Sequence, residues 1–168
     1  YFPHGAGFGA MTAIAIVIPA DLPREDVKAF SIDDVTTTEI DDAFSVTKLA
    51  DGKVQIGIHI AAPALGIALG TPLDAIARAR LSTVYFPGAK ITMLPEPAIA
   101  AFTLAAGSER PALSLYVEVA ADGTMAATHT RCERVPVAAN LRHGELDEVF
   151  NADTLAAGDI AHEYGAEL

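Results

Sequence analysis

The residues most able to do chemistry are five carboxylates that fall within ten positions, in the segment 33–42. The segment contains no lysine or arginine, and apolar, strand-like sequence flanks it on both sides. Two carboxylates held ~4 Å apart repel each other by about 4 kcal/mol near a protein surface. A cation relieves that repulsion, and carboxylate oxygens are the donors that hard divalent ions prefer. The five residues are Asp33, Asp34, Glu39, Asp41 and Asp42.

This acidic run has three interpretations. The plainest is a solvated acidic loop. A calcium loop of the EF-hand type is less favoured, because the run lacks the alternating D-x-D-x-D-G start and the glycine at the sharp turn. Phosphoryl chemistry fits the oxygens best, since two metal ions ~3.5–4 Å apart can clamp the attacking and leaving oxygens of an in-line displacement. Such a pair of ions needs several carboxylates from one neighbourhood.

A β-hairpin is predicted to follow the acidic run. Apolar residues alternate with others over 54–60, which is the period of a half-buried strand, and Asp51-Gly52 in front of it favours a tight turn. The partner strand is predicted over 43–49. If the loop consists of those two residues alone, Phe44 lies opposite His59.

The same pattern predicts a second hairpin, with strands at 113–119 and near 124–135. Thr71 followed by Pro72 is an N-cap and first-turn pair that predicts a helix over 72–81. Shorter helical patterns cover 97–104, 145–150 and 154–163. Strands and helices in mixed order with antiparallel hairpins predict an α+β fold, with a mixed, largely antiparallel sheet and flanking helices.

Composition restricts the classes of function. The chain has 168 residues, 51% of them hydrophobic, which excludes intrinsic disorder. A single cysteine, Cys132, excludes a disulfide scaffold, and no Cys/His grouping has zinc-ligand spacing. No apolar stretch provides the ~20 uninterrupted residues of a membrane helix. With neither an initiator Met nor a secretory signal, the sequence predicts a cytoplasmic protein that is a piece of a longer one.

The charge balance bears on nucleic-acid binding. The chain has 11 basic and 22 acidic residues, a formal net charge of −11. Proteins held to nucleic acid by phosphate contacts carry clustered Lys and Arg, so this chain as a whole repels a polyanion. A role on nucleic acid therefore requires a basic surface from elsewhere.

The acidic segment resembles the catalytic signature of the ribonuclease II and ribonuclease R exoribonucleases, whose catalytic domain is called RNB: Ser31-Ile32-Asp33, then an acidic position at 39, then Asp-Asp-Ala at 41–43. Further motifs continue the resemblance in order: VQIGIHIA at 54–61, GTPLD at 70–74, TVYFP at 83–87, MLPE at 93–96 and RPALS at 110–114. We therefore expect residues 19–168 to form the N-terminal part of an incomplete RNB-type catalytic domain. Residues 1–18 are then a preceding segment or the end of an upstream domain.

The family resemblance implies a magnesium-dependent hydrolase that degrades single-stranded RNA from its 3′ end and releases nucleoside 5′-monophosphates. It also implies four catalytic residues that hold two magnesium ions: Asp33, Glu39, Asp41 and Asp42. Tyr85 falls on the family's tyrosine that packs against a base near the 3′ end, and Arg110 is a candidate phosphate contact. The implied partners are single-stranded RNA, the remaining part of the catalytic domain and OB-type RNA-binding domains outside this sequence, and no membrane is involved.

Several alternatives accompany this interpretation. Glu39 stands where the family usually has Asp, which motivates an RNB-like RNA-binding protein with weak or lost catalysis as the alternative function. A metal-binding structural domain unrelated to RNA is a third hypothesis. Among single residues, Arg110 beside Glu109 is equally consistent with a structural ion pair, Tyr85 with ordinary packing, and His59 with a structural, hydrogen-bonded histidine.

Overall fold

The computed structural model describes residues 5–9, 15–158 and 160–168. The chain divides into two compact units, each built from two separate stretches of sequence: Tyr1–Asp21 with Ala62–Thr103, and Leu22–Ala61 with Leu104–Leu168. The predicted preceding segment at 1–18 lies partly outside the described residues. Within those described ranges, no helix is long and apolar enough to cross a membrane.

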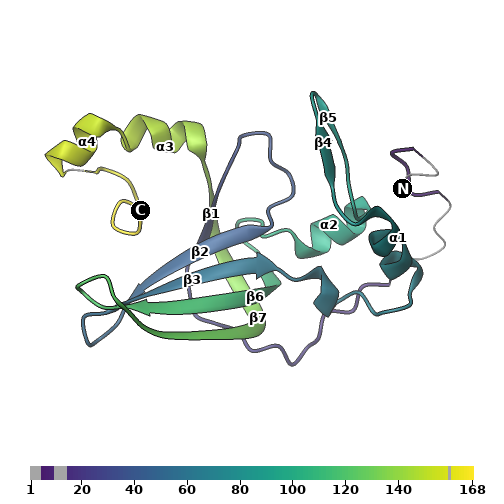
Figure 1. Cartoon of the computed structure of the whole chain (residues 1–168), viewed down its shortest axis with the longest axis horizontal. Helices are drawn as coiled ribbons and strands as arrows, with labels where there is room; N and C mark the ends of the chain where they lie inside the picture. The colour runs from purple at the N-terminus through teal and green to yellow at the C-terminus, as the bar shows by residue number, and fades with distance from the viewer. Residues whose placement is uncertain (1–4, 10–14, 159) are drawn as a thin grey trace. The chain divides into compact units, whose positions relative to one another are not determined.

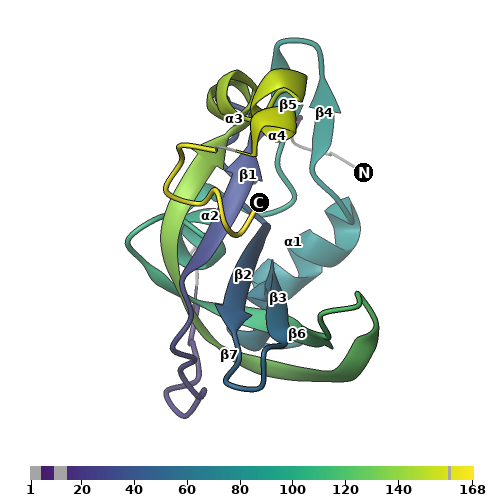
Figure 2. The same cartoon turned by 90° about the vertical axis from the view of Figure 1, so that its left-hand side faces the viewer.

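The second unit is a closed β-barrel with the strand order β1-β2-β3-β6-β7 (Figure 1). Its strands are β1 (Ala29–Asp33), β2 (Asp42–Lys48), β3 (Val54–Ala61), β6 (Glu109–Val119) and β7 (Met125–Arg142). Neighbouring strands are antiparallel except β1 and β7, which are parallel and close the barrel. β1, β2 and β3 can be followed side by side in Figure 2. A mixed, largely antiparallel sheet with helices confirms the predicted α+β class.

Both predicted hairpins are present, as β2–β3 and β6–β7. The predicted pairing of Phe44 with His59 is wrong, because Ala43 lies opposite His59 and Phe44 lies opposite Ile58. The reason is the length of the connection. The backbone N–H of Leu49 bonds to the carbonyl of Lys53 at 2.8 Å, so the turn contains more than the Asp51-Gly52 pair and the register moves by one residue.

The barrel contains an apolar core cluster, to which both its strands and the segments next to them contribute. Its buried members are Val27, Ala29, Ile40, Ala43, Leu104, Ala112, Tyr116, Val135 and Val137. Two short helices follow the last strand, α3 (His143–Val149) and α4 (Ala152–Ala157). The helix predicted over 154–163 is wrong beyond 157, because Gly158 adopts a left-handed φ of 67° and its N–H bonds back to Thr154 at 3.1 Å, which ends the helix.

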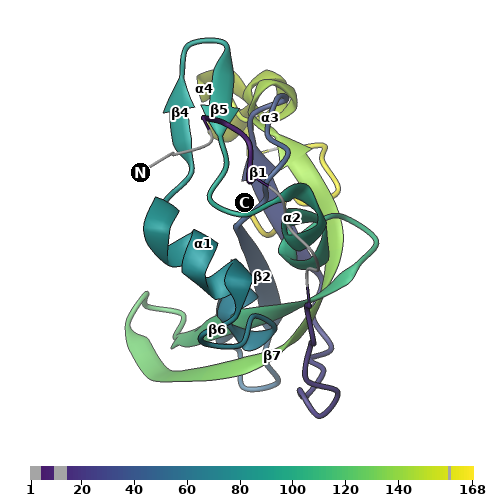
Figure 3. The same cartoon turned by 90° about the vertical axis from the view of Figure 1, so that its right-hand side faces the viewer.

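The described residues of the first unit form a short 3-10 turn, two helices and a small two-stranded sheet. These elements are η1 (Pro63–Leu65), α1 (Pro72–Arg80), β4 (Val84–Phe86), β5 (Ala89–Ile91) and α2 (Glu96–Phe102). The elements α1, α2, β4 and β5 can be followed in Figure 3. The predicted N-cap is confirmed, since the Thr71 hydroxyl accepts a hydrogen bond from the Asp74 N–H at 3.3 Å. Leu73, Leu94 and Ala98 form the buried centre of this unit.

Candidate active site

The acidic run forms the loop between β1 and β2, at one end of the barrel. Asp33 ends β1 and lies in register with Arg142, which ends the parallel strand β7. Asp42 begins β2 and lies opposite Ile60, near the end of β3. Since β6 also begins at this end, the topology brings the acidic loop and the ends of all barrel strands together. The sequence prediction of a loop anchored by strands on both sides is confirmed.

Asp33 is held by a chain of polar side chains from two strands. Its Oδ2 accepts a hydrogen bond from the Ser31 hydroxyl at 2.5 Å, and that hydroxyl oxygen accepts one from Nδ2 of Asn140 at 2.9 Å. Asn140 also donates to the carbonyl of Leu104 at 2.9 Å and accepts from the N–H of Ala106 at 2.7 Å. The orientation of the Asp33 carboxylate is therefore set by β1, β7 and the segment that precedes β6.

The start of the loop is ordered by Asp34. Its Oδ1 accepts from the N–H of Thr36 at 2.8 Å and from the Thr36 hydroxyl at 2.7 Å. These two hydrogen bonds, the backbone one first, hold the pKa of Asp34 below its usual value. Arg142 Nη1 donates to the carbonyl of Asp34 at 2.7 Å, so β7 supports the loop here as well.

The end of the loop is anchored through its backbone. Ile40 is buried, and its carbonyl accepts a hydrogen bond from the N–H of Leu104 at 2.9 Å. The carbonyl of Asp41 accepts one from the N–H of Ala61 at 2.8 Å. Glu39 lies half-buried just before this anchor, whereas Asp41 and Asp42 are exposed. The loop is thus tied to the barrel at both ends, with its last two carboxylates facing solvent.

The family resemblance implies four metal ligands, all of them carboxylates. Their carboxylate oxygens are the right kind of donor for magnesium. In the part of the chain that the structure describes, however, no group of three or more His, Cys, Asp or Glu side chains is arranged to hold a metal ion. The oxygen donors suit magnesium, but these side chains are not arranged around a common point where an ion could bind. The roles of Asp33, Glu39, Asp41 and Asp42 as ligands therefore stay a prediction.

Arg110 lies near the start of β6, at the same end of the barrel as the acidic loop. It pairs in register with Val135, and its Nη1 donates to the carbonyl of Glu109 at 3.4 Å. The role of Arg110 as a phosphate contact stays a prediction. The carboxylate of its neighbour Glu109 forms its ion pair with Arg24, at 2.6 Å.

Tyr85 lies in the other compact unit, at the middle of the short strand β4. It pairs with Lys90 of β5, and Pro87 directly follows the strand. The residue is 68% exposed, which is far more than a packing role requires. The ring is therefore accessible to a ligand.

Sequence reasoning missed Arg142 and the cavity beside it. A cavity of about 320 Å³ lies next to the acidic loop, lined by Asp34, Val35, Arg142, His143, Gly144, Glu145 and Glu148. The signal was absent from the sequence because Asp33 and Arg142 meet through the parallel pairing of β1 and β7, which joins distant positions. At this cavity Arg142 lies beside Asp34, whose carbonyl its Nη1 contacts at 2.7 Å.

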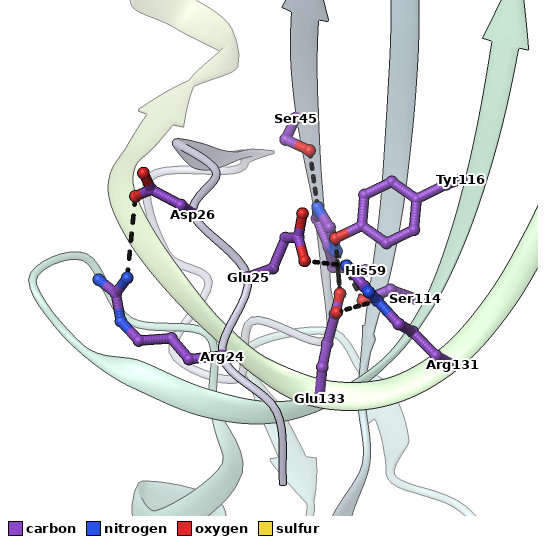
Figure 4. Close-up of polar contacts among 9 residues, drawn as sticks. All are labelled: Arg24, Glu25, Asp26, Ser45, His59, Ser114, Tyr116, Arg131 and Glu133. Atoms are coloured by element: carbon purple, nitrogen blue, oxygen red, sulfur yellow. Dashed lines mark hydrogen bonds and ion pairs between the residues drawn. The ribbon is translucent and has the colours of Figure 1, made fainter.

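A buried polar network inside the barrel was also not predicted as a network (Figure 4). At its centre His59 contacts the hydroxyl of Ser45 through Nε2 at 2.9 Å and the hydroxyl of Ser114 through Nδ1 at 2.8 Å. Burial lowers the pKa of His59 to about 4, against an opposing effect of Glu133, so the ring is neutral at pH 7. A Cβ at Gly57 would overlap Ser45 and the ring, so this strand position requires glycine. His59 is the structural histidine that the sequence suggested.

Glu133 is the buried carboxylate of this network. It is fully buried, and its Oε1 accepts a hydrogen bond from the Tyr116 hydroxyl at 2.6 Å. Its Oε2 forms an ion pair with Nε of Arg131 at 2.5 Å, and Arg131 also contacts Glu25. Burial and this neighbouring carboxylate raise the pKa of Tyr116. The network lies within the barrel, so we interpret it as a structural feature. Oε2 of Glu133 and Nε of Arg131 form an ion pair but no hydrogen bond.

The fold and the site together define a β-barrel domain with a carboxylate-rich loop at one end. The chain belongs to the RNB domain family, whose model matches residues 23–162. This confirms the resemblance found in the sequence. The predicted domain boundary between residues 18 and 19 stays a prediction.

Comparisons with individual proteins agree with this family. The chain is 42% identical over 128 residues to Exoribonuclease 2 of Serratia proteamaculans, which is 73% of this chain and 20% of that protein. A structure of Mycoplasma genitalium RNase R in complex with ribose methylated single-stranded RNA superposes with a TM-score of 0.72 at 16% identity, over 89% of this chain and 23% of that one. Yeast Ssd1, a pseudonuclease, superposes with a TM-score of 0.73 at 21% identity, over 82% of this chain and 18% of that one. The chain thus spans about a fifth of the length of the curated relatives it matches.

Proposed function

We propose that this chain supplies the acidic part of the active site of a 3′-to-5′ exoribonuclease that hydrolyses single-stranded RNA to nucleoside 5′-monophosphates. One observation carries the proposal: the four signature carboxylates fall in one anchored loop of a chain that is 42% identical over 128 residues to an Exoribonuclease 2. Because the chain matches 20% of that relative, the activity is proposed for the larger polypeptide and not for residues 1–168 alone.

Magnesium, as two ions, is part of the proposal. Its support is the number of hard oxygen donors near one loop, together with the divalent-metal requirement expected of this family. The acidic loop cannot itself attract RNA, since carboxylates and phosphates repel each other. The basic surface that binds the RNA backbone is accordingly proposed to come from the rest of the larger polypeptide, with Arg110 as a contribution from this chain.

The experiment uses a chimera in which residues 23–162 replace the matching segment of Serratia proteamaculans Exoribonuclease 2. The chimera is incubated with 5′-labelled single-stranded RNA, with and without magnesium, and the products are resolved by length. Progressive shortening only with magnesium is expected. Asp41→Asn removes a charge without changing volume, so nucleotide release should fall by orders of magnitude while RNA binding survives.

The matched control is Asp51→Asn, which makes the same isosteric change at an exposed aspartate in the β2–β3 connection. It should leave nucleotide release at the level of the unmodified chimera. Magnesium binding is measured separately by isothermal titration calorimetry, and Asp41→Asn should weaken it. Release from Asp41→Asn close to that of the control would refute the assigned role of the acidic loop.

An RNB-like RNA-binding protein with weak or lost catalysis is the second candidate. Glu39 favours it, because its carboxylate stands one methylene further from the backbone than the aspartate usual in the family. The likeness to a pseudonuclease also means that the fold alone does not decide activity. For an active enzyme, Glu39→Asp should be tolerated or raise the rate of release. A chimera that retains RNA uncut, and cuts it only after Glu39→Asp, would favour the second candidate.

A further inference from the structure

Asn140 of β7 contacts two other parts of the barrel unit through its side-chain amide. It lies in register with Ser31 of the parallel strand β1. Its Nδ2 lies 2.9 Å from Oγ of Ser31 and 2.9 Å from the carbonyl of Leu104, and its Oδ1 lies 2.7 Å from the N–H of Ala106. Ser31 and Leu104 are both buried. One side chain therefore joins β7 to β1 and to the segment that precedes β6.

The backbone groups around Asn140 determine which way its amide points. A carbonyl can only accept a hydrogen bond, and a backbone N–H can only donate one. The contact with the carbonyl of Leu104 therefore requires the NH2 group of the amide, and the contact with the N–H of Ala106 requires its oxygen. With the amide fixed in this way, the group that faces the Ser31 hydroxyl is an N–H donor.

This donor decides where the proton of the Ser31 hydroxyl goes. A hydroxyl has one proton and two lone pairs, so its oxygen can accept from Asn140 while its proton is donated to a different group. That group is the carboxylate of Asp33, whose Oδ2 lies 2.5 Å from the Ser31 oxygen. Asn140 thus acts through Ser31 on the direction of the first acid of the signature.

The same amide also reaches the other end of the acidic loop. Leu104, whose carbonyl accepts from Asn140, donates its own N–H to the carbonyl of Ile40 at 2.9 Å. Ile40 is buried and belongs to the second half of the signature, residues 39–42. The chain of contacts that begins at Asp33 therefore ends at Ile40, with Asn140 in its middle.

We propose that Asn140 is a positioning residue of the active site, which directs the Ser31 proton to Asp33 and sets the distance from that acid to the second half of the signature. Its effect on the geometry stands on the contacts given above, and its effect on RNA cleavage rests on the proposed function. Two experiments separate these effects. NMR of the 168-residue chain reads the geometry, and kinetics of the chimera defined above read the consequence for cleavage.

Two substitutions remove different parts of the amide. Asn140→Asp keeps the shape and an acceptor for Ala106 but loses both donors, so the Ser31 hydroxyl then lies between two carboxylates that compete for its one proton. Asn140→Leu loses the donors and the acceptor alike. The matched control is Asn151→Asp, which adds the same charge at the other asparagine of the chain. Asn151 caps α4 by accepting from backbone N–H groups, which a carboxylate also does.

The carbon NMR signal of the Asp33 carboxyl group reports the direction of this side chain, because it depends on the hydrogen bond that the carboxylate accepts. Asn140→Asp and Asn140→Leu should both change this signal. Ser31→Ala should change it as well, since it removes another member of the same chain of contacts. Asn151→Asp should leave the signal unchanged.

Amide hydrogen exchange reports the second branch of contacts. Asn140→Leu should speed exchange at Leu104 and Ala106 by at least about tenfold, because Ala106 loses its acceptor and Leu104 loses the contact that holds its carbonyl. Ser31→Ala should leave both rates unchanged. Amides of the β2–β3 hairpin are the internal reference, since they report any loss of stability of the whole barrel.

In the chimera, Asn140→Leu should lower nucleotide release at saturating RNA by about tenfold per folded molecule, with an unchanged KM, because RNA still binds. Asn140 and Ser31 act on Asp33 in series, so the double variant with Ser31→Ala should lose no more than the larger of the two single losses. A residue needed only for folding would lower the folded fraction and leave kcat per folded molecule unchanged.

Three results would overturn the proposal. One is an Asp33 signal that stays the same in Asn140→Asp as in Asn151→Asp. Another is unchanged exchange at Leu104 and Ala106 in Asn140→Leu, and the third is losses of release that multiply in the double variant. If Asn140→Leu does not fold, Asn140→Asp supplies both the carbon signal and the kinetics. If the unmodified chimera releases no nucleotide while the NMR results are as expected, the proposed function fails and the positioning of Asp33 by Asn140 stands.

Discussion

The hydroxyl of Ser31 donates a 2.5 Å hydrogen bond to the carboxylate of Asp33, two residues further along β1. Both side chains lie on the same side of the strand, as residues at i and i+2 must. Asn140 on the parallel strand β7 donates to the same hydroxyl at 2.9 Å. Asp33, the first acid of the signature, is therefore oriented by a buried serine that carries no charge. This contact fixes the direction in which the Asp33 carboxylate points.

Ser31→Ala tests this relationship. Loss of a hydrogen bond to a charged group costs about 1.5–3 kcal/mol, so nucleotide release from the chimera should fall by about tenfold or more. The control is Ser45→Ala, which removes a hydroxyl buried to the same degree but bonded to His59. That control should lower stability and leave release per folded molecule unchanged. Equal losses of release in both variants would contradict a specific role for Ser31.

The stability of the 168-residue chain should fall as the solution becomes acidic, because of His59. Its pKa is lowered from 6.5 to about 4 by burial, so between these values the unfolded chain binds a proton that the folded chain excludes. The contribution of neutral His59 to the free energy of unfolding is fully present above pH 6.5. It decreases by roughly 3 kcal/mol in total as the pH falls towards 4. Urea unfolding at pH 7 and pH 5 measures the difference.

His59→Gln should reduce this pH dependence, although it lowers stability at pH 7. An exposed histidine, His143, serves as the control, and His143→Gln should leave the slope unchanged. If His59→Gln loses as much stability between pH 7 and pH 5 as the unmodified chain, another group is responsible for the acid sensitivity.

Arg131→Met should be among the most destabilising single changes in the barrel. It leaves the fully buried carboxylate of Glu133 without its cation, and removing one partner of a buried ion pair costs about 3–5 kcal/mol. Arg78→Met removes an ion pair with Asp74 at 3.9 Å whose arginine is 74% exposed, so it should cost less than about 1 kcal/mol. Chemical unfolding of the two variants compares these losses, and similar values would mean that Glu133 is compensated without Arg131.

Tyr85→Ala tests the family resemblance away from the acidic loop. Stacking of one base on an aromatic ring is worth roughly 1–3 kcal/mol, a small share of the binding of a long RNA and a large share for a few nucleotides. In the chimera, the initial degradation of long RNA should therefore be nearly unchanged while the shortest end product changes length. Phe86→Ala, at the next and alternately directed position of β4, is the control. An unchanged end product in Tyr85→Ala would return this residue to a structural role.

The sequence alone was sufficient for the features that depend on neighbouring residues. The alternation over 54–60 predicted β3, and the Thr71-Pro72 pair predicted the start of α1. The run from Asp33 to Asp42 predicted the acidic loop, and its resemblance to a known signature, with the ordered motifs after it, indicated the family. These succeed because strand alternation, helix caps and short motifs are determined by side chains only a few positions apart.

Other features were decided only by the tertiary structure. The β2–β3 register depends on the turn between Leu49 and Lys53, because a turn that is one residue longer shifts the pairing by one position. The position of Arg142 beside Asp33 depends on the parallel closure of β1 on β7. The polar interior around His59 and Glu133 depends on which side of each strand faces inward. Strand alternation is symmetric between the two faces of a sheet, so only long-range pairing and closure of the barrel determine which set of side chains is buried.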